Sequence, residues 1–128
     1  MFEKTKNQIK LLAIQAACML DTEIKGIDFK HTRMAWYRPK TKRITIPVWM
    51  LHNSQKFIED GYLDIWTRWL VIHEVCHCVV LGHGIVFKKV EVEICNLFGI
   101  LILERIKSYP RKLYCLREKK SFSDFQEY

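Results

Sequence analysis

The chain has 128 residues, of which 49% are hydrophobic and 27% charged, and its formal net charge is +7. This length and balance are typical of one soluble globular domain with a sizeable core. We expect no membrane span, because the apolar stretch 62–81 contains charged residues and the stretch 92–103 is shorter than the ~20 apolar residues that a span needs.

The first half of the chain predicts a helix followed by strands. Apolar residues recur at helical spacing in residues 4–20, with lysines on the opposite side, which indicates an amphipathic helix. Three short runs rich in β-branched and aromatic residues then predict strands at 27–29, 34–37 and 44–48. A turn at residues 38–42 makes the last two strands a hairpin.

The second half is predicted to be mainly helical. We interpret residues 50–61 as a connection, 62–81 as a strongly apolar helix, and 84–106 as another helix with a long apolar stripe. Residues 110–117 predict a final strand or an extended arm, and residues 118–128 a polar tail.

Together these elements predict an α+β fold. We expect one small domain over residues 1–117, with an N-terminal helix, a short antiparallel sheet and two helices that carry a metal site.

The apolar helix carries a pattern that is typical of zinc sites. Residues 73–84 read HEVCHCVVLGHG. His73 and His77 are four residues apart, so both imidazoles lie on one helix face and can bind one metal ion. Glu74 is left free as a general base, and the glycines beside His83 break the helix so that His83 can turn back to the same metal.

Other residues compete for the position of third ligand. Glu91 or Glu93 in the following helix would replace His83 in a glutamate-type zinc site. Cys76, three residues after His73, could approach the metal, although a buried core thiol is the simpler interpretation.

The pattern resembles the SprT-like zincin metallopeptidases and their WLM and YgjP-like relatives. These families combine an H-E-x-x-H helix with a third histidine in an H-G/S-x-x-F segment, and here that segment is His83-Gly84-Ile85-Val86-Phe87. The apolar residues before His73 and the preceding predicted strand are also similar. The resemblance covers roughly residues 27–105 and implies Zn²⁺ bound by His73, His77 and His83, with Glu74 as the general base. The zinc ribbon that many SprT-like proteins carry is missing.

The resemblance implies hydrolysis of peptide bonds by a zinc-activated water. We expect the strand at 44–48 to bind an extended peptide by strand addition. A donor for the developing oxyanion is left open among Tyr109, Arg111 and Tyr114.

The positive charge is concentrated in two segments. Residues 29–58 contain seven Lys or Arg and no Asp or Glu, and residues 105–120 contain seven Lys or Arg and one Glu. Solvated faces and a nucleic-acid surface remain alternative interpretations of these segments, and relatives in the SprT-like family act on proteins attached to DNA.

The alternative function is a non-catalytic module, in which the histidines hold a structural zinc and the basic segments bind nucleic acid or a partner protein. Five cysteines without a C-x-x-C pair, and no visible signal peptide, favour a cytoplasmic location.

Overall fold

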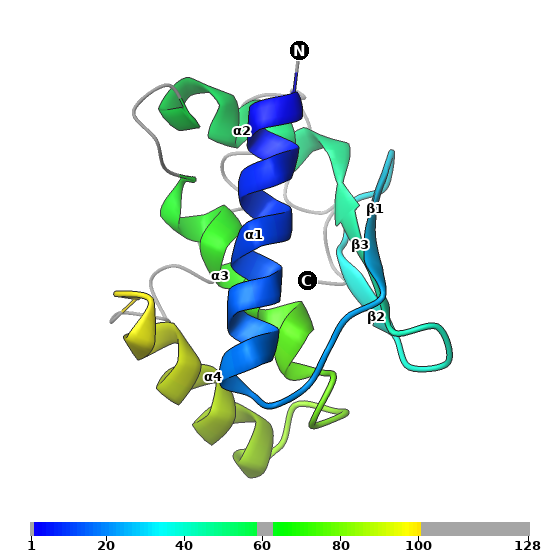
Figure 1. Ribbon diagram of the computed structural model, residues 1–128, viewed down its shortest axis with the longest axis vertical. Helices are drawn as coiled ribbons and strands as arrows, with labels where there is room; N and C mark the ends of the chain where they lie inside the picture. Colours follow the sequence, from blue (N-terminus) through cyan, green and yellow to red (C-terminus); the bar gives the residue numbers. More distant parts are fainter. Residues whose placement is uncertain (1, 59–62, 101–128) are drawn as a thin grey trace, which may run out of the picture.

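The computed structural model describes residues 2–58 and 63–100, which form a small α+β fold (Figure 1). Its elements, in chain order, are α1 (Glu3–Met19), β1 (Gly26–Lys30), β2 (Trp36–Arg38), β3 (Arg43–Pro47), α2 (Val48–Ile58), α3 (Ile65–Cys76) and α4 (Ile85–Leu97).

Helix α3 lies at the centre of the fold and contacts α1, α4 and the strands β2 and β3 (Figure 1). Nine of its twelve residues are buried. Helix α1 packs on α3 through the apolar face predicted for residues 4–20, which includes Ile9, Ala13 and Ala16. A helix that is covered on several sides reads as an almost continuous apolar run. The buried polar side chains of α3, Thr67 and Glu74, are therefore held in a mostly apolar setting.

The sheet is mixed, so the prediction of an antiparallel sheet was only partly right. Its strand order is β1-β3-β2, with β3 antiparallel to β2 and parallel to β1. Because β3 is the central strand, neighbours occupy both of its edges. The prediction that residues 44–48 accept a peptide by strand addition was therefore wrong. The strand that lies at an edge next to α3 is β2.

The segment 50–61 was predicted as a connection, and this was wrong as far as the structure describes it. Helix α2 starts immediately after Pro47 and continues to Ile58. It packs against α1 and β3, and the ring of Trp49 stacks on that of Trp66 with centroids 4.9 Å apart. Burial of this aromatic and apolar face stabilises the helix despite residues that favour strands.

Helix α3 is shorter than predicted at both ends. The Asp64 carboxylate caps it by accepting from the backbone N–H of Thr67, and the Ser54 hydroxyl donates to the same carboxylate. The helix ends at Cys76, before the glycines that were expected to end it, and His77 is its C-cap. The third histidine, His83, lies in the loop before α4 rather than in a helix.

No helix within the described ranges is both long and apolar enough to cross a membrane. The predicted segments 110–117 and 118–128, and the domain boundary between them, lie outside the described residues.

Candidate metal centre

Three histidines from two adjoining segments converge at the end of α3. His83 Nε2 lies 3.1 Å from His77 Nε2 and 3.2 Å from His73 Nε2. The ligand atoms of all three residues lie within 4.8 Å of one another. These three residues could therefore hold one metal ion.

The donor set fits zinc. With a zinc–nitrogen bond of about 2.0–2.1 Å and tetrahedral angles, two ligand nitrogens are roughly 3.3 Å apart. The two nitrogen–nitrogen distances at His83 are close to this value. Three neutral imidazoles suit a borderline-soft ion such as zinc better than calcium or magnesium, which prefer oxygen ligands.

The loop between α3 and α4 brings His83 to the other two histidines. Gly82 has a φ of +82°, a conformation that L side chains rarely adopt, and it reverses the chain after the turn that follows α3. Gly84 is then the N-cap of α4. The glycine at position 82 therefore has a direct role in placing the third imidazole.

The ring of Phe87 forms the apolar support of the cluster. Its centroid lies 5.0 Å from that of His73, 4.4 Å from His77 and 5.1 Å from His83, and it is stacked on His77. Phe87 is 1% exposed and belongs to the first turn of α4. This contact gives a physical reason for the four-residue spacing in the H-G-x-x-F segment, because residues i and i+4 share a side of the chain as it enters a helix.

The orientation of His77 is set by the backbone. Its Nδ1 lies 3.0 Å from the carbonyl oxygen of Val80. Since a carbonyl oxygen only accepts, Nδ1 carries the hydrogen and the Nε2 lone pair faces His83. Burial lowers the pKa of His77, while the Val80 carbonyl opposes this shift. The imidazole is therefore kept neutral, which is the form that binds a metal.

Glu74 is a buried carboxyl group next to the cluster. It is 5% exposed, and burial raises its pKa to about 7, although the neighbouring His73 lowers it. The carboxyl group does not belong to the group of side chains that could hold a metal ion. It lines the same cleft as the three histidines.

This cleft has a volume of about 660 Å³ and runs between α3 and β2. Besides the three histidines and Glu74, its described lining is apolar, aromatic or glycine: Met34, Ala35, Trp36, Tyr37, Trp69, Leu70, Leu81 and Gly82. No Lys or Arg belongs to this described lining. The open side of the histidine cluster therefore faces a mainly hydrophobic cavity.

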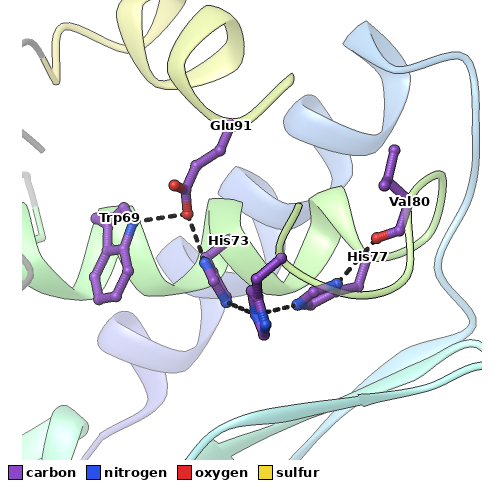
Figure 2. Close-up of polar contacts among 6 residues, drawn as sticks. Trp69, His73, His77, Val80 and Glu91 are labelled. Carbon is purple, nitrogen blue, oxygen red and sulfur yellow. Dashed lines mark hydrogen bonds and ion pairs between the residues drawn. The ribbon is translucent and has the colours of Figure 1, made fainter. Parts of the chain in front are cut away.

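The competing ligands are placed elsewhere. Glu91 contacts Nδ1 of His73 at 2.5 Å and is not part of the group that could hold the ion (Figure 2). Glu93 is exposed on α4 beside a separate pocket. Cys76 is fully buried in the core, where burial raises the pKa of its thiol, and Cys78 interacts with Tyr37.

The basic residues of segment 29–58 that the structure describes differ in their surroundings. Lys40 and Lys42 are exposed in the turn between β2 and β3, whereas Arg43 forms a bidentate ion pair with Asp28. Tyr109, Arg111 and Tyr114, the proposed oxyanion donors, and the basic segment 105–120 lie outside the described residues.

The sequence analysis did not predict two contacts of the site, that of Phe87 with the three histidines and that of Glu91 with His73. Phe87 was assigned to an ordinary core stripe, and Glu91 was considered only as a rival ligand. A signal for Glu91 was present, because an acidic residue on the otherwise apolar face of Phe87 and Ile94 needs a polar partner.

Comparisons of the chain with protein-family models, curated proteins and solved structures found no match.

Proposed function

We propose that this protein is a zinc-dependent metallopeptidase of the SprT-like type, with His73, His77 and His83 as the zinc ligands and Glu74 as the general base. The observation that carries the proposal is the position of Glu74. A nearly buried carboxyl group follows the first ligand directly and lines the same cleft as the three imidazoles. A structural zinc site has no use for such a group, whereas hydrolysis requires a base.

Zinc, when bound, supplies Lewis acidity that lowers the pKa of a water molecule to about 7 and polarises a carbonyl group. The three imidazoles are neutral donors, so they leave the charge of the ion uncompensated. Glu74 accepts the proton of the attacking water and returns it to the leaving amine. In the metal-free chain burial raises the pKa of this carboxyl group, and a carboxyl group whose pKa is raised towards neutral pH is suited to proton transfer.

The cleft favours an extended peptide with apolar side chains near the bond that is cleaved. Trp36 and Tyr37 of the edge strand β2 line the cleft. Within the described residues, β3 is the only strand that pairs with β2. A peptide chain could therefore pair with the outer edge of β2, which replaces β3 in our earlier expectation. Met34 and Leu70 offer apolar surface for the side chains of that peptide.

The test is peptide hydrolysis by the Glu74→Gln variant. An unfolded protein with many apolar residues is the substrate, and zinc content is measured in the same samples. We expect the variant to keep its zinc and to lose at least about 10²-fold in rate, because an amide cannot accept the proton. Glu93→Gln is the matched control, since Glu93 is exposed on α4 and should keep full activity.

Full activity in Glu74→Gln would exclude Glu74 as the base. A zinc-loaded parent protein that cleaves no unfolded substrate would support the alternative, a zinc-stabilised module that binds nucleic acid or a partner protein through its basic segments.

A further inference from the structure

Glu91 is a buried carboxylate that the proposed reaction does not use. It belongs to α4 and is 1% exposed. Two side-chain nitrogens of α3 reach the same oxygen: Oε2 lies 2.5 Å from His73 Nδ1 and 3.2 Å from Trp69 Nε1 (Figure 2). Trp69 and His73 are four residues apart, so both donors lie on the face of α3 that meets α4.

The contact determines which nitrogen of His73 carries the hydrogen. The indole Nε1 of Trp69 can only donate, so Oε2 of Glu91 accepts from it. An ionised carboxylate also accepts from His73, which places the hydrogen on Nδ1. The lone pair of His73 Nε2 then faces His83 Nε2 at 3.2 Å. This is the tautomer that can bind a metal ion together with the other histidines.

Glu91 is poorly placed to be a ligand itself. The two nitrogens of an imidazole point away from each other in the ring plane. A carboxylate bound at Nδ1 therefore lies on the side of His73 opposite to the converging Nε2 atoms. The group of side chains that could hold the ion contains the three histidines and not Glu91.

We propose that Glu91 is a positioning residue for the metal centre, which acts through His73, and that Trp69 holds Glu91 in place. The carboxylate fixes the tautomer and the ring orientation of His73, and its negative charge makes Nε2 a stronger donor. This inference rests on the metal site of the proposed function but does not depend on peptidase activity.

The test uses the full chain and two metals, zinc and cobalt. Zinc affinity is measured by competition with a chromophoric chelator, and the visible absorption spectrum of the cobalt-loaded protein reports the ligand geometry. We expect Glu91→Ala to weaken zinc binding by about 10–100-fold, the usual effect of losing such a partner. Its cobalt spectrum should differ from that of the parent, because the His73 ring is no longer held.

Two further variants separate positioning from packing. Glu91→Gln keeps the shape and an acceptor oxygen, so it should restore most of the parent cobalt spectrum while zinc binding stays weaker, because the charge is lost. Trp69→Phe removes one donor to Glu91 and should weaken zinc binding less than Glu91→Ala does. Glu93→Ala, two residues further along α4 and exposed, is the control and should match the parent.

Zinc affinity and cobalt spectra equal to those of the parent in both Glu91 variants would overturn the proposal and leave Glu91 as a packing residue. A parent protein that binds neither metal would overturn the site and this inference together. Absence of peptidase activity with the expected order of zinc affinities would overturn the proposed function and leave the role of Glu91 intact.

Discussion

Ionisation of Glu74 should destabilise the metal-free protein. The carboxyl group is 5% exposed, and burial raises its pKa from the usual 4.5 to about 7. A group whose pKa is higher in the folded state stabilises the fold at low pH, and this contribution is lost as the pH rises through the folded value. At about 1.4 kcal/mol for each pH unit between the two pKa values, the loss at pH 8 is about 3 kcal/mol. About 2 kcal/mol of it falls between pH 5.5 and pH 8.

The assay is urea unfolding of the parent and of Glu74→Gln at both pH values with a chelator present. Most of the buried core residues belong to α1, α2, α3 and the sheet, so we expect the metal-free chain to fold. The uncharged amide has no ionisation cost, so the variant should gain about 2 kcal/mol relative to the parent between pH 5.5 and pH 8. Glu93→Gln should show no such gain, because Glu93 is exposed. A difference between parent and Glu74→Gln that is the same at both pH values would refute the reasoning.

Three other changes test the loop, the aromatic support and the basic hairpin. Gly82→Ala should cost about 1–2 kcal/mol of stability and weaken zinc binding, because φ is +82° there; no atom lies within 4 Å of the added methyl group, so the cost is one of backbone conformation. Gly84→Ala, where φ is −75°, is the control, and equal unfolding free energies for the two variants would contradict this prediction. Phe87→Leu is a large-to-small change in the core and should cost roughly 0.5–3 kcal/mol of the free energy of unfolding. It should also reduce zinc retention, because the ring that stacks on His77 is lost. Unchanged zinc retention would show that the ring is not needed. The double variant Lys40→Ala/Lys42→Ala should bind single- and double-stranded DNA more weakly than the parent, with a smaller salt dependence. Arg43 is left unchanged because it pairs with Asp28. If the parent does not bind DNA at low salt, or if parent and variant bind equally, these lysines contribute only to solubility.

Local periodicity explains which parts of the fold could be predicted. The amphipathic face of α1 and the apolar run of α3 follow directly from residue spacing. Helix α2 was missed because Val48 was assigned to the predicted strand 44–48 and Trp49 also favours strands. Packing against α1 and β3 makes this segment helical. The parallel pairing of β1 with β3 joins strands that are not consecutive, and no local pattern encodes it.

The same distinction applies to the site. The spacing of His73 and His77 is a property of one helix, so the sequence was sufficient to bring them together. The approach of His83 to the other two histidines also depends on the positive φ of Gly82. In the sequence, the two glycines beside His83 indicated a break in the helix. The contact between Glu91 and His73 joins two helices across eighteen positions, and only the packing of α4 on α3 reveals it.

The most direct test of the central claim is the metal content of the purified protein. Elemental analysis should find zinc at about one ion per chain, and His77→Ala and His83→Ala should both lose it, because each removes one of the three converging imidazoles. Glu93→Ala should keep its zinc. A parent protein without stoichiometric metal, or histidine variants that keep the zinc content of the parent, would contradict the account.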